Sequence, residues 1–211
     1  MLFNVTTRVN ILLIRFLRAD NLPSTTEKIL NTAMECFFQH GYDTANISMV
    51  SRYAGISRVT IHKQFKSKEV LFRSVLEKHF QQHNILIDIY SKSEANFWQE
   101  TQDLIIQRCE GLFNDVSSSL VRSNLIHAGH AYCKDLIQAE EGLIKNSIRS
   151  RIEKEISANR LTLSKVGLTA DELAETLHFA PFGITVSVSN QNNIAFVENL
   201  MAIFKASTSR L

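Results

Sequence analysis

The sequence predicts an all-α protein, and its composition and periodicity are the evidence. The 211 residues include only 7 glycines and 2 prolines, which suits long helices with short connections. Apolar residues recur at steps of three and four along most of the chain, without the sustained alternation that strands require. Hydrophobic residues make up 45% of the chain, enough for a core of ordinary size.

The first helix is expected to begin after Pro23. Ser24 and Glu27 have the spacing of a capping box, in which each residue binds the backbone N–H of the other. Apolar residues then follow at helical spacing: Ile29, Leu30, Ala33, Phe37 and Phe38. Gly41 should end this helix, because glycine tolerates the left-handed backbone of a helix C-cap.

Two short helices and a long one are expected next. Thr44 or Asn46 can cap the second helix. A three-residue turn, Gly-Ile-Ser at 55–57, then leads into a short third helix that extends through Gln64. Ser67 can cap a fourth helix, which should run to about residue 87.

The remaining chain also reads as helical. A connection at 91–96 is expected to act as a hinge, and helices should follow near 96–114, 117–130, 135–158, 170–188 and 192–206. Thr169 and Glu172 form a second capping box at the start of the fourth of these. Pro181 should kink that helix, because proline removes a backbone hydrogen bond.

Positive charge gathers between residues 44 and 68, where no acidic residue occurs. The basic residues there are Arg52, Arg58, Lys63, Lys66 and Lys68. Such a patch on a chain with a formal net charge of only +2 is typical of a surface that binds a polyanion. A solvated helix face would carry the same charges, so charge alone does not decide between the two interpretations.

The two short helices fit a helix-turn-helix, in which a three-residue turn often contains glycine. In that arrangement the second helix enters the DNA major groove, while helix N-termini bind phosphate groups. The segment 57–64 is short, polar and cationic, and it lacks the broad apolar stripe of a helix that packs on both sides.

A set of spaced positions connects this segment with a known family. They are Ile29-Leu30, Ala33, Phe37, Gly41-Tyr42, Ile47, Val50, Ala54-Gly55-Ile56-Ser57, Thr60-Ile61, Phe65, Ser67-Lys68-Glu69 and Leu71. With these residues the chain resembles the N-terminal DNA-binding domain of the TetR/AcrR family of transcriptional regulators. Val59 and His62 depart from the family pattern, which has Gly and Tyr there, and this departure bears on the operator sequence more than on DNA binding itself.

The candidate DNA contacts follow from helix position and from this resemblance. Asn46 and Ser48 would contact phosphate from the start of the second helix, and Lys68 from the start of the fourth. The recognition helix would present Arg58, Val59, Thr60, His62 and Lys63. His62 could donate to a phosphate in place of the family's Tyr, and Val59 could contact a thymine methyl group.

The resemblance also implies a homodimer and a small-molecule pocket in the C-terminal half. The last two helices have broad apolar stripes that suit a four-helix dimer interface, although both stripes could instead line the core of one chain. Candidate residues for an apolar or aromatic effector are Trp98, Cys109, Phe113, His127, Tyr132, His178, Phe179 and Phe182. Aromatic residues at helical spacing are, however, more often ordinary core residues.

Other chemistry has little support in the sequence. His127, His130 and Cys133 follow one another at steps of three, but a metal site needs three or four converging ligands. We find no glycine-rich phosphate loop, nucleophile elbow or catalytic pair of carboxylates, and expect neither enzymatic activity nor a cofactor. Three widely spaced cysteines and the lack of a membrane-length apolar stretch favour a cytoplasmic location.

The expected organisation has three parts. Residues 1–22 form an N-terminal extension, residues 23–68 a helix-turn-helix DNA-binding domain, and residues 69–211 a helical ligand-binding and dimerisation domain. The expected function is that of a homodimeric repressor that a small ligand releases from a palindromic double-stranded operator. The alternative is a helical small-molecule-binding protein or enzyme with a vestigial helix-turn-helix, and the basic stretch favours the first.

Overall fold

The computed structural model describes residues 23–110, 116–185 and 193–209. Its helices are α2 (Thr25–Thr44), α3 (Ile47–Ala54), α4 (Arg58–Gln64), α5 (Lys68–Lys92), α6 (Phe97–Glu110), α7 (Ser119–Tyr132), α8 (Lys134–Ser157), α9 (Ala170–Thr185) and α10 (Asn193–Thr208). In these ranges the β-structure is one isolated bridge between Leu161 and Ser209. The predicted all-α class is therefore confirmed.

Polar side chains fix where the helices begin, as the sequence predicted. Ser24 Oγ accepts from the backbone N–H of Glu27 at 3.1 Å, and the Glu27 carboxylate accepts from that of Ser24 at 3.2 Å. Asn46, Ser57 and Ser67 cap α3, α4 and α5 through their side-chain oxygens. Each cap satisfies a backbone N–H that would otherwise have no partner in its helix.

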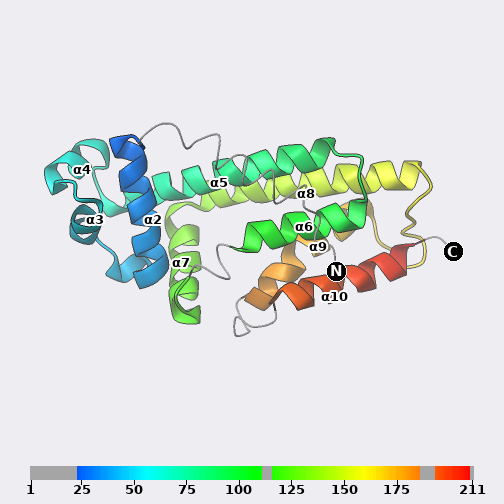
Figure 1. Cartoon of the computed structure of the whole chain (residues 1–211). Coiled ribbons are helices and arrows are strands. Elements are labelled where there is room, and N and C mark those ends of the chain that lie inside the picture. The colour runs from blue at the N-terminus through cyan, green and yellow to red at the C-terminus, as the bar shows by residue number, and fades with distance from the viewer. Residues whose placement is uncertain (1–22, 111–115, 186–192, 210–211) are drawn as a thin grey trace.

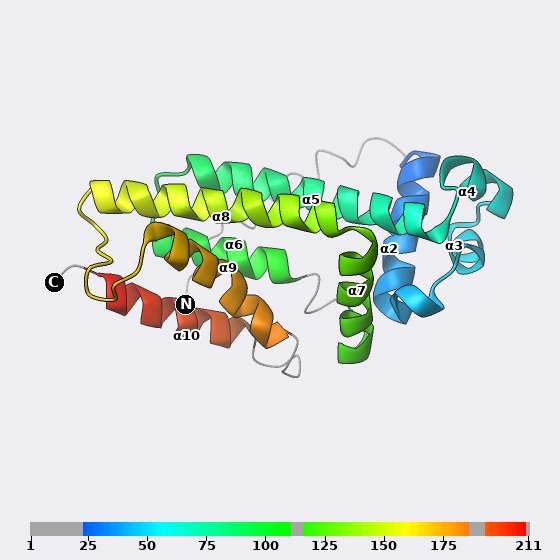
Figure 2. The same ribbon diagram turned by 180° about the vertical axis from the view of Figure 1, so that it is seen from behind.

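The molecule is elongated, with α2, α3 and α4 gathered at one end (Figure 1). We call these three helices the head and α5–α10 the body. Helices α5 and α8 run side by side along the body, with α6, α9 and α10 on one side of them (Figures 1 and 2). Helix α7 crosses this direction and lies next to α2, at the junction of head and body (Figure 2).

Two apolar cores hold the fold together. The body core joins α5, α6, α8, α9 and α10 around the fully buried Ile144, Ile148 and Leu173. The head core surrounds Phe37 and Ile61, and it also includes residues of α5 and α7 such as Leu125. Because burying a large apolar side chain contributes about 1.5–3 kcal/mol, the shared core fastens the head firmly to the body.

Some predicted boundaries need correction. Gly41 does leave helical geometry, with φ 76° and ψ 167°, but α2 resumes for a further turn and ends at Thr44. Helix α9 does not end at Pro181 but continues to Thr185. The segment 91–96, predicted as a hinge to the second half of the chain, contains the end of α5 and its connection to α6 within the body.

Candidate functional site

Helix α4 presents a polar face outward because two apolar residues anchor its other side. Ile61 is fully buried and Phe65, directly after the helix, is 6% exposed. Ser57 caps the helix by accepting from the backbone N–H of Thr60 at 3.1 Å, and the two hydroxyls lie 2.9 Å apart. The four remaining candidates on this helix, Arg58, Val59, His62 and Lys63, are all exposed, Val59 to 66%.

Helix α3 supports α4 and contributes its own N-terminus. Asn46 Oδ1 accepts from the backbone N–H of Met49 at 3.0 Å, so this candidate side chain caps the helix. Ser48 is exposed in the first turn. Gly55 ends the helix with φ 63°, a left-handed conformation that creates the tight turn into α4.

Lys68 has structural partners that the sequence did not indicate. Its ammonium group donates to the backbone carbonyls of Tyr42 at 2.9 Å and Asp43 at 3.3 Å. The same group lies 4.3 Å from the centre of the Tyr42 ring. Lys68 thereby fastens the start of α5 to the end of α2.

Three further residues of the basic stretch lie on this end of the molecule and were missed as candidates. Arg52 and Tyr53 on α3 are exposed, and the Arg52 guanidinium lies 5.8 Å from the centre of the Tyr53 ring. Lys66, between α4 and α5, is exposed as well. The signal for Arg52 and Lys66 was present, because both belong to the acid-free segment.

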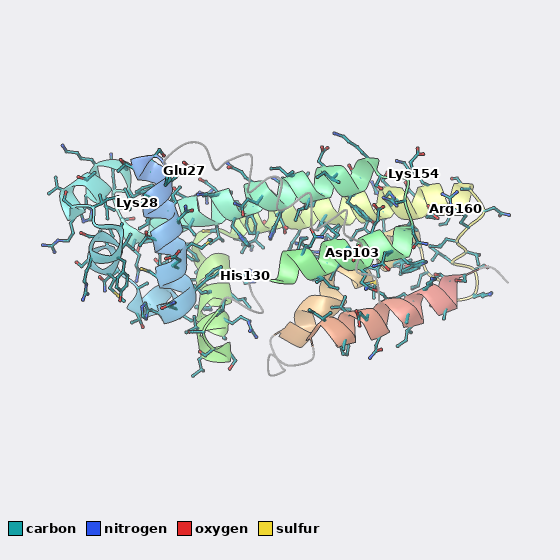
Figure 3. The ribbon with its side chains drawn as sticks, in the orientation of Figure 1. Glu27, Lys28, Asp103, His130, Lys154 and Arg160 are labelled. Carbon is teal, nitrogen blue, oxygen red and sulfur yellow. The ribbon has the colours of Figure 1, made fainter. Side chains whose placement is uncertain are left out.

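A cavity of about 350 Å³ lies where the head meets the body. Helices α2, α5, α6, α7, α8 and α9 all contribute to it. Its apolar lining includes Met34, Phe37, Phe38, Phe72, Val75, Leu76, Phe80, Leu125, Ile126 and Ile137. Its polar lining includes His79, His83, Arg108, His130, Glu140, Glu141 and His178. Figure 3 labels His130 on α7, the helix beside the head.

A buried ion pair lies among these polar residues. Arg108 Nη2 donates to both carboxylate oxygens of Glu140 at 2.7 Å, and Nε donates to Oε1 at 3.0 Å. His83 Nδ1 lies 3.3 Å from the same Oε1. Burial raises the pKa of Glu140, but the hydrogen bond from His83 and the charge of Arg108 outweigh it and lower that pKa to about 2. Glu140 is therefore an anion at neutral pH, matched by Arg108.

Two other histidines of the cavity are uncharged at neutral pH. Burial, together with the nearby His83, lowers the pKa of His79 to about 3. Burial, together with the charge of Arg108, lowers the pKa of His178 to about 4. A neutral imidazole has one nitrogen that donates and one that accepts, so both side chains can form hydrogen bonds without adding charge.

The predicted effector residues are dispersed in the structure. His178 and Phe179 line the cavity. Trp98 instead packs edge-on against Phe97 beside the body core, with ring centres 4.9 Å apart. Tyr132 lies 5.0 Å from the Tyr42 ring at the junction with the head. His127 is exposed. Phe113 lies outside the described residues, and the structure does not describe the side chains of Cys109 and Phe182.

Most of the polar residues that line the cavity were not predicted from the sequence. His79 and His83 interrupt the apolar face of α5 one helical turn apart, and Arg108 follows Leu104 and Ile105 on α6. Polar residues at otherwise apolar helix positions are the signal that could have identified them. Their convergence with Glu140 depends on how α5, α6 and α8 pack, which the sequence pattern does not specify.

Helix α7 connects the cavity to the head. Leu125, Ile126 and Gly129 line the cavity. Asn124, on the same helix, accepts from the backbone N–H of Asp43 at 3.2 Å and donates to the Asp43 carboxylate at 2.6 Å. A displacement of α7 at the cavity would therefore act on the end of α2.

Two other kinds of site are absent from the described ranges. Among those residues, no three His, Cys, Asp or Glu side chains converge as metal ligands. Of the helices in the same ranges, none combines the length and apolarity that crossing a membrane would need.

Comparison with known sequences supports the resemblance of the head. Residues 29–75 match the family model described as "Bacterial regulatory proteins, tetR family". The chain is 36% identical over 50 residues to the HTH-type transcriptional repressor ComR of Escherichia coli strain K12. This match covers 24% of each protein, so the chain spans about a quarter of the length of that relative.

Solved structures extend the similarity to the body. A TetR transcription regulator from Haloarcula marismortui superposes with a TM-score of 0.72 at 14% identity, covering 90% of this chain and 100% of that one. SmeT, the repressor of a Stenotrophomonas maltophilia multidrug efflux pump, gives 0.66 at 16% identity, covering 88% and 90%. The complex of SmeT with triclosan gives 0.65 at 15% identity, covering 89% and 92%. At these identities the comparison establishes the fold.

Proposed function

We propose that this chain, which belongs to the TetR family of bacterial regulatory proteins, is a repressor that binds double-stranded DNA and is released by a small ligand. The main support is the exposed, cationic face of α4 above its apolar anchors Ile61 and Phe65. Because its apolar residues stay buried in the head core, this helix can enter a major groove without disturbing that core.

The proposed DNA contacts divide into two groups. Arg58, Val59, Thr60, His62 and Lys63 would face the major groove from α4, where hydroxyls and long cationic side chains can reach base edges or the neighbouring phosphates. Asn46, Ser48 and Lys68 would face phosphates from the ends of α3 and α5. For Lys68 this contact would add to its hydrogen bonds with the two backbone carbonyls of α2. We add Arg52 and Lys66 as candidates for phosphate contacts.

We further propose that the chain is a cytoplasmic homodimer through α9 and α10. Leu177, Val197 and Met201 belong to the body core, so one side of these helices serves a single chain. Ile194, Phe196 and Ile203 on α10 are nevertheless 45%, 41% and 64% exposed. An apolar surface of this kind suits a second copy, and two heads would match a palindromic operator.

We propose that residues 23–68 bind DNA and that residues 69–211 bind the ligand and form the dimer. The cavity includes Phe37 and Phe38 of α2, so a bound ligand would touch the head itself. Release then requires two conformations of the protein that differ in the position of the head. The ligand must bind more tightly to the conformation whose head does not fit the operator.

Fluorescence anisotropy with double-stranded DNA from upstream of the gene tests the proposal. We expect specific binding that weakens steeply with salt, because phosphate contacts release counterions. Absence of binding to any double-stranded DNA at low salt would contradict the proposal. The helical small-molecule-binding protein or enzyme would then be the better interpretation.

A further inference from the structure

We infer that the cavity selects an uncharged aromatic molecule bearing one hydrogen-bonding group, such as a phenol, over carboxylate and ammonium analogues of the same shape. This inference rests on the proposed function, because it names the chemistry of the proposed ligand. The argument uses the apolar wall, the matched ion pair and the neutral imidazoles of the cavity.

The apolar wall favours an aromatic ligand. Phe37, Phe38, Phe72 and Phe80 line the cavity from α2 and α5. A volume of about 350 Å³ lies at the lower end of the range for ligand sites, about 300–1,000 Å³. Aromatic rings can stack on these side chains edge-on or offset, as Phe37 and Phe72 already do with ring centres 5.0 Å apart.

The Arg108–Glu140 pair disfavours a charged ligand. Glu140 already accepts three hydrogen bonds from Arg108, and the side chains are only 6% and 3% exposed. A carboxylate ligand would compete with Glu140 for Arg108 and leave one buried anion without its partner. An ammonium ligand would have to approach Glu140 next to the Arg108 cation. Glu141 also lines the cavity, but it is partly exposed to water, which weakens its attraction for a cation.

The imidazoles supply the hydrogen bond that an uncharged ligand needs. His79 and His178 line the cavity from α5 and α9, and both are neutral at pH 7. A phenol hydroxyl can donate to an imidazole nitrogen or accept from an imidazole N–H, so either tautomer serves. A ligand without such a group would cover the half-buried His79 imidazole without forming a hydrogen bond to it.

Three naphthalene derivatives of nearly equal size test the inference on the full chain at pH 7. They are 2-naphthol, which is uncharged, 2-naphthoate, an anion, and 2-naphthylmethylamine, a cation. Isothermal titration calorimetry should give a Kd for 2-naphthol that is at least about tenfold lower than for either charged probe. Equal or tighter binding of a charged probe, or no binding of 2-naphthol, would overturn the inference.

The variant Glu140→Gln tests the role of the ion pair. It removes the negative charge that competes with an anionic ligand for Arg108, so 2-naphthoate should gain at least about tenfold in affinity relative to 2-naphthol. Glu153→Gln removes the same charge from an exposed position of α8 and should leave the ranking unchanged. An unchanged ranking in a folded Glu140→Gln variant would also contradict the inference. If that variant does not fold, the ranking of the three probes on the unaltered chain still decides.

The outcomes separate this inference from the proposed function. DNA binding is measured in the absence of any probe, so it can succeed while 2-naphthol fails to bind. In that case the chain remains a DNA-binding regulator and only the assigned ligand chemistry is wrong.

Discussion

Gly41 is a single residue on which the geometry of the junction depends. Its φ of 76° is in the region that side-chain-bearing residues rarely adopt, and a Cβ there would lie 2.8 Å from Asn124 Oδ1. We expect Gly41→Ala to lower the free energy of unfolding by roughly 1–3 kcal/mol, measured by urea denaturation. Gly142→Ala is the control, because a Cβ there meets nothing within 4 Å and should stabilise α8 by about 0.5–1 kcal/mol. Equal stability of the two variants would contradict this account.

His178 makes stability depend on pH. Burial lowers the pKa of His178 from its usual 6.5 to about 4; the charges of Arg108 and Lys145 act in the same direction, and Glu140 opposes them. The unfolded chain therefore binds a proton that the folded chain does not, and stability falls as the pH drops from 6.5 towards 4. In His178→Gln this dependence should be weaker by up to about 1.4 kcal/mol per pH unit, measured by urea denaturation at pH 7, 6 and 5. Parallel pH profiles for the two proteins would show that His178 does not cause the effect.

Helix α7 is the element through which we expect the cavity to act on the head. The hydrogen bond from Asn124 Nδ2 to the Asp43 carboxylate can be tested by a double-mutant cycle with Asn124→Ala and Asp43→Ala, because the second substitution keeps the backbone N–H that also binds Asn124. The coupling free energy of unfolding should be about 0.5–1.5 kcal/mol, as is typical of hydrogen bonds. Additive effects of the two substitutions would mean that this contact does not join the helices.

Helices α4 and α5 give different expectations for the stability of two lysine variants. Lys63 is exposed on α4, so Lys63→Ala should reduce the slope of log affinity against log salt by about one, without loss of stability. Lys68→Ala should also destabilise the fold, because it removes two hydrogen bonds to the end of α2. Anisotropy titrations at several salt concentrations, together with urea denaturation, measure both effects. A Lys63→Ala variant with an unchanged slope would place that lysine away from phosphate.

Across the whole molecule, the sequence was most informative where structure is local. The caps at Ser24, Asn46, Ser57 and Ser67 depend on residues three positions apart, and all were predictable. The cavity depends on six helices that come together from distant parts of the chain. Its lining therefore could not be derived from periodicity, which marks Phe37 as a core residue but does not reveal the empty space beside it.

The assembly of two chains is the remaining expectation for the molecule as a whole. Ile203 on α10 is 64% exposed, and in the proposed homodimer it would be covered by the second copy. Ile203→Asp would bury a charge there, so we expect a monomer by multi-angle light scattering. Ile89→Asp on α5, where the side chain is 46% exposed, is the matched control and should remain dimeric.

The monomer should also bind the operator less well, because one head contacts a single half-site. Light scattering and anisotropy on the same sample then link assembly to DNA binding. A dimeric Ile203→Asp variant would place the interface away from this face of α10. A monomer with undiminished affinity would show that the two heads do not bind the operator together.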